Sequence, residues 1–207
     1  MQEIEATTEE KESFRILAQY MTATRWGEEL AGQQIVPTEQ NVCDFIGRVA
    51  SDSYASNQWV YDKYLPTRVA EEVYTEVYTE ESIKEYAKSV FGLELSTIHE
   101  GCLIERNGNY VDMDAQLDSA DKCEITKVMK DGANYIVTGT NAFGEYRDIY
   151  SGQPTYVGTY NFIMTLIKSE DSPLGYVFQN ITYEGEETIE TEQQRESLKQ
   201  RKFETKK

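Results

Sequence analysis

The chain has one histidine, three cysteines and four prolines among its 207 residues. A single histidine leaves no pair of imidazoles for a metal centre, and Cys43, Cys102 and Cys123 lack the Cys-x-x-Cys spacing of zinc sites. Three cysteines also exclude a disulfide framework, although one bridge, with Cys102–Cys123 as the favoured pair, stays open beside the alternative of three buried thiols. We therefore expect neither a metal nor a cofactor.

Long hydrophobic runs are missing as well. No stretch approaches about 18 apolar residues, so we expect no direct membrane insertion by this chain. Residues 1–10 show no basic-then-apolar signal peptide; they are rich in Glu and Thr and read as an acidic stalk of the kind that follows an anchor. The Tyr, Thr and Asn content suits an extracytoplasmic bacterial domain, such as a lipoprotein, whose anchoring segment is absent from this chain. A cytoplasmic location is the alternative.

Positive charge is scarce, because 37 acidic side chains stand against 20 basic ones and the net charge is −17. A surface this negative repels phosphate backbones, which argues against nucleic acid as a partner and against docking on anionic lipid. Apolar residues make up 39% of the chain and include 15 tyrosines, whose rings can pack while their hydroxyls seek polar partners. This composition suits one domain with a core.

The first half of the chain carries helix signals. Thr7 with Glu10 forms a capping box, and the apolar stripe that follows predicts a helix to about residue 30. Thr38 and Thr79 can cap two further helices. The residues expected to face the core are Phe14, Leu17, Ala18, Met21 and Leu30; Val42, Phe45, Ile46 and Val49; and Ile83, Tyr86, Ala87, Val90 and Phe91, before a terminating Gly92.

A local duplication precedes the third of these helices. The tetrad Glu-Val-Tyr-Thr occurs twice in succession over residues 72–79. On a helix, this repeat stacks the two valines on each other and the two tyrosines on each other, which gives an apolar seam beside an acidic ridge. We therefore predict that the helical part of the chain covers residues 11–91, including this segment.

From residue 102 onward the hydrophobic period changes to two, which is typical of strands. Asn107-Gly108 predicts a hairpin that pairs Ile104 with Val111 on an apolar face. Asp131-Gly132 predicts a second hairpin, in which Val128 pairs with Tyr135 and Thr126 with Val137, followed by a loop at residues 141–154.

The clearest strand signal covers residues 155–184, where a Ser-Pro-Leu-Gly turn joins strands 155–168 and 176–184. One face of the first strand is apolar and the other is polar, so one face packs and the other meets water. The apolar parity holds Tyr156, Tyr160, Phe162, Met164 and Leu166, and the polar parity holds Thr155, Thr159, Asn161 and Thr165. The sequence therefore predicts a single α+β domain over residues 11–185, with N-terminal helices packed on a curved antiparallel sheet of about six strands at 102–184, and a charged tail at 186–207.

A curved sheet wrapped by N-terminal helices resembles the cystatin-like or nuclear-transport-factor-2-like α+β cone. Ser172-Pro173-Leu174-Gly175 and the strand after it also look like the Asn-Pro-x-Gly loop and last strand of the bitopic scaffold proteins of type IV secretion and conjugation, with Ser172 in place of Asn. That family has no catalytic residues and works by oligomerising and holding partners at the membrane. The resemblance implies a partner-binding role, although Pro-x-Gly between two strands is also ordinary turn chemistry.

Two further features offer chemistry in principle. His99 could serve as a general base, but its neighbour Glu100 points to the opposite face of an extended segment, so we expect a solvated connector histidine. Four aspartates crowd residues 112–121, but their spacing fits no EF-hand and the central glycine is missing, so we expect a solvated loop rather than a calcium site. We assign no catalytic residue and no metal ligand.

The remaining candidate site is aromatic. Rings from the helices and the sheet could line the mouth of a cone and hold a small amphipathic ligand or a sugar, or they could simply fill the core between the layers. The candidate residues are Trp26, Trp59, Tyr61, Tyr64, Tyr156 and Tyr160.

Three functions follow from these patterns. The leading one is a non-enzymatic extracytoplasmic domain that binds a partner protein or a component of the cell envelope. The second is a small-molecule-binding cone domain with a cavity between helices and sheet. The third is a cone-fold isomerase or hydratase that uses a carboxylate and tyrosines.

Overall fold

A computed structural model of the chain describes residues 1–23, 30–55, 64–72, 75–99, 101–112, 119–145 and 155–188. Its elements form two antiparallel sheets, with strand orders β1-β7-β8-β9-β10-β2 and β3-β4-β6-β5, and three helices. The helices are α1 (Thr8–Ala23), α2 (Glu39–Ala55) and α3 (Glu80–Phe91). The strands are β1 (Gln2–Glu3), β2 (Gln34–Ile35), β3 (Arg68–Glu72), β4 (Thr75–Tyr78), β5 (Leu103–Arg106), β6 (Asn109–Asp112), β7 (Ser119–Asp131), β8 (Asn134–Glu145), β9 (Thr155–Lys168) and β10 (Tyr176–Thr188).

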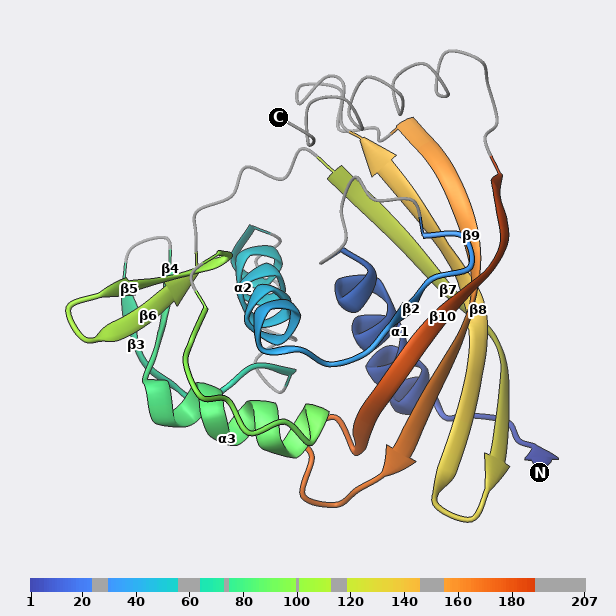
Figure 1. The fold of residues 1–207 in the computed structure, drawn as a ribbon, viewed down its shortest axis with the longest axis horizontal. Helices are drawn as coiled ribbons and strands as arrows, with labels where there is room; N and C mark the ends of the chain where they lie inside the picture. Colours follow the sequence, from blue (N-terminus) through green and yellow to red (C-terminus); the bar gives the residue numbers. More distant parts are fainter. Residues whose placement is uncertain are drawn as a thin grey trace.

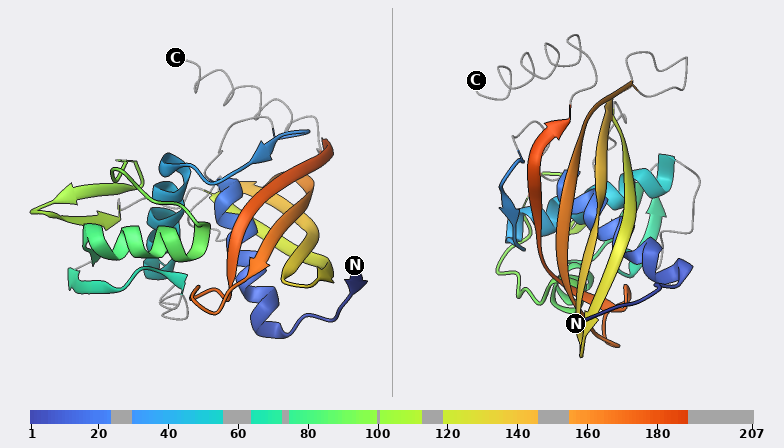
Figure 2. Two further views of the ribbon diagram at one scale, coloured as in Figure 1. Left: turned by 60° about the horizontal axis from the view of Figure 1, so that its bottom comes forward. Right: turned by 90° about the vertical axis from the view of Figure 1, so that its right-hand side faces the viewer.

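The elements are layered in the order large sheet, α1, α2, small sheet (Figure 1). Helix α1 packs on β7, β8 and β10, and α2 packs on α1 and on the strands of the small sheet. Helix α3 lies against β10. The large sheet is long and curved, and the helices occupy its concave side (Figure 2). The predicted α+β class, with helices packed on a six-stranded antiparallel sheet, is confirmed.

The β9–β10 hairpin has the predicted faces. Tyr160, Phe162, Met164 and Leu166 are all buried, whereas the residues of the opposite parity are partly or fully exposed where they are described. Gly175 closes the turn with a φ of 75°, and its amide donates to the carbonyl of residue 172 at 2.8 Å. The alternation in the sequence therefore defines the concave face of the large sheet.

The β7–β8 hairpin turns one residue later than predicted. The turn falls at Gly132-Ala133, so Val128 pairs with Val137 rather than with Tyr135. A two-residue hairpin turn needs a positive φ at its first position, and Gly132 supplies it with a φ of 62°. Because the pairing shifts by two residues, each side chain keeps its predicted face.

The helix caps form as predicted. Thr7 and Glu10 exchange hydrogen bonds at 3.0 and 3.2 Å, and Thr38 and Thr79 each accept the amide three residues on. Gly92 ends α3 in the left-handed conformation. All the helical residues predicted to face the core are buried. None of the helices in the described ranges is long and apolar enough to cross a membrane.

The duplicated Glu-Val-Tyr-Thr segment contributes to a β-hairpin, so the prediction of a helix there is wrong. Strands β3 and β4 pair antiparallel, with Glu71 opposite Glu76 and Glu72 opposite Thr75. A repeat of four residues is also two full strand periods, so it places its copies on one face of a strand as well as of a helix. Val, Tyr and Thr favour strands, and this preference is the one the structure follows.

The Asn-Gly hairpin forms with the predicted register, since Ile104 lies opposite Val111 and both turn residues have positive φ. It does not join the large sheet, however, because Val111 also pairs with Val77 of β4. On the predicted apolar face, Val111 is buried, whereas Ile104 on the edge strand is 39% exposed. The predicted apolar face is therefore only partly covered.

The N-terminal region differs from the prediction at two points. Residues 2–3, which were assigned to an acidic stalk, form β1 and pair with β7. The amide of Ile4 continues this contact by donating to the carbonyl of Val128 at 3.0 Å. Helix α1 begins at Thr8 and ends at Ala23, before residue 30.

Two strands extend further than the local composition suggested. β8 runs to Glu145, into the predicted loop at 141–154, and β10 runs to Thr188, into the predicted charged tail. Both extensions pair with β9, and cross-strand pairing overrides weak local preference. The domain boundaries themselves stay predictions.

Candidate functional site

The structure describes the side chains of two of the six predicted pocket residues, and both are buried. Tyr160 lies on the concave face of β9, whereas the main-chain carbonyl of Tyr64 accepts a hydrogen bond from Tyr86 on α3. These two tyrosines thus contact different elements. Only the backbone of Tyr156 is described, and Trp26, Trp59 and Tyr61 lie outside the described residues.

Tyr160 belongs to an uncharged polar layer at the C-terminal end of α1. Its ring meets that of Tyr183 edge-on, with 5.9 Å between centroids. The Tyr183 hydroxyl hydrogen-bonds Thr22 Oγ1 in the last turn of α1, and Thr22 Oγ1 donates to the carbonyl of Ala18 at 2.5 Å. A threonine hydroxyl has one proton, so Tyr183 is the donor in its bond with Thr22.

Asn141 lies in the same layer, at the inward register of β8. Along this strand Tyr135, Val137 and Gly139 face the core, and Asn141 follows them with an exposed fraction of 0%. Within the part of the chain that the structure describes, neither its amide nitrogen nor its amide oxygen has a hydrogen-bond partner. A buried polar group without a partner costs about 1–3 kcal/mol, so native proteins rarely keep one without a reason.

The strand register surrounds Asn141 with neutral side chains. Its cross-strand neighbours are Cys123 on β7 and Tyr160 on β9. Asn141 is not among the candidate residues predicted from the sequence, because the local composition favours a loop from residue 141 onward. The signal was present all the same: a polar residue continues the alternation of Tyr135 and Val137 on the apolar parity.

Nearer the hairpin turns, rings fill the space between helices and sheet. Phe14 of α1 packs on Tyr176 with 4.9 Å between ring centroids. Phe91 of α3 contacts Phe45 of α2 at 5.1 Å and Phe178 of β10 at 5.9 Å. In this half of the molecule these aromatic residues fill the core.

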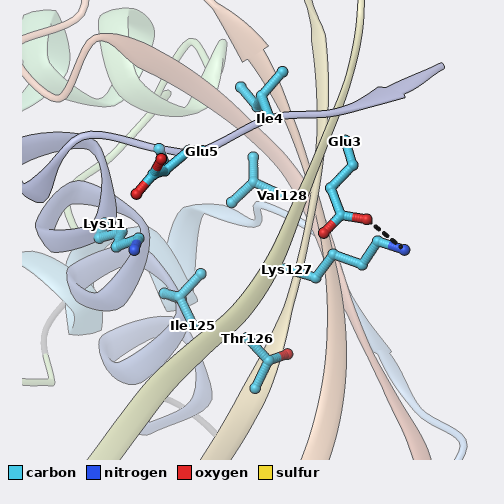
Figure 3. A pocket seen from close by; sticks show the side chains of 9 residues that line it. Glu3, Ile4, Glu5, Lys11, Ile125, Thr126, Lys127 and Val128 are labelled. Atoms are coloured by element: carbon cyan, nitrogen blue, oxygen red, sulfur yellow. Dashed lines mark ion pairs between the residues drawn. The ribbon is translucent and has the colours of Figure 1, made fainter.

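A groove of about 310 Å³ lies between the N-terminal segment and β7 (Figure 3). Ile4, Ile125 and Val128 contribute apolar side chains to it, and it also carries the ion pair between Glu3 and Lys127, with 3.2 Å between Oε2 and Nζ. Glu5 and Lys11 lie on the α1 side, so acids and bases are balanced. The lining residues are Glu3, Ile4, Glu5, Ala6, Lys11, Ile125, Thr126, Lys127 and Val128.

The groove borders an edge of the large sheet. Strand β1 pairs with β7 only at Met129 and Lys130, and within the described residues no strand pairs with the outer edge of 119–127. A β-bulge interrupts β7 at Thr126, whose Oγ1 donates to the carbonyl of Thr138 at 3.1 Å. Bulges and lysines on an edge strand limit unselective pairing with other strands.

A second hollow, of about 200 Å³, lies between the start of α1 and the β9–β10 turn. The Tyr176 hydroxyl donates to Glu10 Oε1 at 2.6 Å, and Lys168 Nζ lies 3.9 Å from the same oxygen. Partial burial opposes ionisation of Glu10, but hydrogen bonds from Tyr176 and Thr7 outweigh it and lower the pKa of Glu10. This network fastens α1 to the sheet.

His99 is half exposed and is paired with Glu39 of α2, whereas its sequence neighbour Glu100 lies outside the described residues. Its Nε2 lies 3.1 Å from Glu39 Oε2, and Glu39 Oε1 accepts the amide of Ser96 at 2.6 Å. Hydrogen bonds from Ser96 and then from His99 lower the pKa of Glu39. The histidine therefore holds the connection after α3 against α2.

The three cysteines are free thiols, which excludes the Cys102–Cys123 bridge. Cys102 lies over α2, where its amide donates to Asp44 Oδ1 at 3.3 Å, whereas Cys123 is on β7 of the large sheet. Burial raises the pKa of the Cys43 and Cys102 thiols.

The side chains of the aspartates at 112–121 are outside the described residues. The side chains that the structure does describe include no group of three His, Cys, Asp or Glu able to hold a metal.

Comparison with protein-family models, with curated proteins and with solved structures finds no match. The architecture itself, helices on the concave side of a curved antiparallel sheet, is compatible with a cone-like α+β fold.

Proposed function

We propose that this chain is a non-enzymatic extracytoplasmic domain that binds a partner protein, and that the partner adds an extended segment to the outer edge of β7. The observation that supports this most directly is the edge itself. β7 has 13 residues, and β1 covers two of them. A strand edge with unpaired amides and carbonyls is a template for an added strand.

The bulge and the groove define where such a segment would sit. Residues 119–125 give an uninterrupted run of β7 on the N-terminal side of the bulge. The groove at Ile4, Ile125 and Val128 can take an apolar side chain of the added strand. The chain carries a net charge of −17, so the partner segment is expected to be basic and to associate faster at low salt.

The non-enzymatic part of the proposal rests on the use of the single histidine in a structural contact with Glu39. Kinship to the cystatin-like or nuclear-transport-factor-2-like cones, and to the scaffold proteins of type IV secretion, is part of the same proposal. It is supported by the helix-then-sheet order and by the turn Ser172-Pro173-Leu174-Gly175. The extracytoplasmic location rests on composition, and fractionation of source cells with an antibody against the domain tests it.

Charge reversal tests the docking edge. The immobilised chain is incubated with envelope extract, the captured protein is purified, and its affinity is measured for wild type, for Glu3→Lys/Glu5→Lys, and for Glu81→Lys/Glu85→Lys. The control pair changes the net charge equally on the exposed side of α3. We expect the groove variant to bind about ten-fold more weakly, a loss of about 1.4 kcal/mol, and the control to bind like wild type.

Hydrogen exchange on the purified complex adds the structural readout. Amides of residues 119–125 that exchange freely in the isolated chain are expected to become protected when the partner is bound. Equal binding by both charge variants, or protection confined to other strands, would contradict docking at β7.

A second candidate function is the binding of a small uncharged molecule on the concave face of the sheet. The unpaired amide of Asn141 favours it.

A further inference from the structure

We infer that the polar layer around Asn141 is a binding site for a small uncharged molecule that presents a hydrogen-bond donor and an acceptor side by side, as a carboxamide or lactam does. This inference is independent of partner docking at β7, because it concerns the opposite, concave face of the sheet. It starts from one observation: the amide of Asn141 is fully buried, and both its nitrogen and its oxygen lack partners among the described residues.

The location of Asn141 relative to α1 supports a ligand rather than a structural role. Helix α1 ends at Ala23, and Thr22 in its last turn reaches Tyr183 in this layer. The strands of the large sheet run on beyond the end of α1 (Figure 1). Asn141 thus lies where the packing of the helix on the concave face stops, and not inside the ring-filled half that Phe14 and Phe91 close.

The chemistry of the neighbours defines the ligand. Cys123, Tyr160, Tyr183 and Thr22 are neutral at physiological pH, so nothing in this set compensates a ligand charge. A carboxamide offers two N–H donors and one acceptor oxygen in a plane, and its best complement is a second amide or lactam edge. The rings of Tyr160 and Tyr183 favour a flat ligand, because aromatic faces and edges pack well together.

The inward position two residues before Asn141 on β8 is a glycine, and a side chain from the neighbouring strand β9 lies against its backbone. Gly139 has no side chain, and an added Cβ would lie 2.7 Å from Phe162 Cζ and closer still to the carbonyl oxygen of Glu124. The Phe162 ring therefore lies across Gly139, one strand period from Asn141 towards the hairpin turns. A ligand would contact Asn141 on the opposite side, away from Phe162 and the hairpin turns.

The test uses two flat probes and a charged analogue. Nicotinamide carries a carboxamide, 2-pyridone carries a lactam, and nicotinate is the anionic counterpart of nicotinamide. We expect the side-chain NH₂ resonances of Asn141 to shift on titration with nicotinamide and 2-pyridone but not with nicotinate. Because these resonances are read in the wild-type protein, this measurement does not depend on the folding of a variant. Asn141 resonances unmoved by both neutral probes would mean that the amide is satisfied by ordered water alone, and would overturn the inference.

Two variants complete the experiment. Asn141→Leu is close in size and removes the unpaired amide, so we expect it to fold with unchanged or higher stability and to bind the neutral probes at least about ten-fold more weakly. Thr140→Val, on the outward face of the same strand, is the matched control and is expected to bind like wild type. Unchanged probe binding by Asn141→Leu, or failure of that variant to fold, would overturn the inference, since failure to fold means that the amide makes stabilising bonds within the chain.

Discussion

At the scale of single residues, Glu10 joins three elements, because it closes the capping box of α1 and accepts the hydroxyl of Tyr176 beside Lys168. These bonds favour the ionised carboxylate, and the pKa of Glu10 is accordingly lowered from its ordinary value of 4.5. A carboxyl whose pKa is depressed in the folded state stabilises the protein above the ordinary pKa, and this stabilisation disappears as the pH falls through the folded pKa.

Replacement of Glu10 by Gln should therefore destabilise the protein at pH 7 by about 1 kcal/mol, and the difference from wild type should shrink as the pH falls below about 4.5. Thermal unfolding between pH 3 and pH 7 measures this. Glu81→Gln, at an exposed position on α3, is the control and should lose little at any pH. A stability difference for Glu10→Gln that does not change with pH would contradict the role of the charge.

Gly139 gives a second prediction at this scale. A Cβ at this position would meet the ring of Phe162 and the main-chain carbonyl of Glu124, and a backbone atom cannot rotate away. We expect Gly139→Ala to lower the free energy of unfolding by about 1–3 kcal/mol, measured by urea denaturation. The neighbouring outward variant Thr140→Ser should change it by less than about 0.5 kcal/mol. Equal losses for the two variants would show that Gly139 is not sterically required.

Individual residues were predictable where one physical rule acts alone. The caps at Thr7, Thr38 and Thr79 follow from the hydrogen-bonding capacity of one side chain, and all three form. Asn141 needs a longer pattern, because its inward position follows from the alternation along β8 and from a strand that continues past Thr140, where the local composition favours a loop. Turn chemistry alone does not decide whether the two turn residues are Asp131-Gly132 or Gly132-Ala133. The pairing of 12 residues of β7 with β8 selects Gly132-Ala133.

At the scale of elements, the segment 68–78 shows where periodicity fails as a guide. Repeats of four residues are compatible with both regular structures. The pairing of β4 with β6, in which Val77 lies opposite Val111 from 34 residues further along the chain, favours the strand through non-local contacts. In contrast, α3 has a cap at each end and a stripe of buried side chains, and for such an element the local sequence is sufficient.

The N-cap of α3 can be tested directly. Thr79 Oγ1 accepts the amide of Ser82 at 3.1 Å, so Thr79→Ala leaves this amide without its partner. The expected loss of stability is about 1 kcal/mol, and Thr79→Ser should retain most of the wild-type value. Chemical denaturation followed by circular dichroism measures both variants. If Thr79→Ser loses as much as Thr79→Ala, the hydroxyl bond is not the source of the effect.

At the scale of the whole molecule, the class and the helix-on-sheet layering were predictable, but the second sheet was not. The small sheet joins two hairpins that are separated in sequence by α3, and α2 lies between it and the large sheet. Nothing in the local pattern of either hairpin specifies which sheet it enters. The addition of β1 to β7 likewise brings together residues more than 120 positions apart, as between Gln2 and Lys130.

This separation of the sheets keeps Cys102 and Cys123 apart, and all three cysteines are free thiols, so no disulfide is expected. Intact mass without reductant should equal that of the fully reduced chain, and all three thiols should react with an alkylating agent in denaturant. In the native protein, the half-buried Cys102 should react before the buried Cys43 and Cys123. All three reactions should be slow, because burial limits access to the thiols and also raises the pKa of Cys43 and Cys102. A mass lower by two hydrogens would contradict the structure.

The order of the elements along the chain also has a consequence for biosynthesis. Helices α1 and α2 leave the ribosome first, yet the apolar face of α1 is covered by β7, β8 and β10, and β10 ends only at Thr188. About 97 residues separate the end of α3 at Phe91 from that point, which corresponds to roughly 5–20 s of translation. During that interval the nascent helices carry uncovered Phe, Leu and Ile side chains, so this chain is a natural client for chaperones that shield emerging hydrophobic segments.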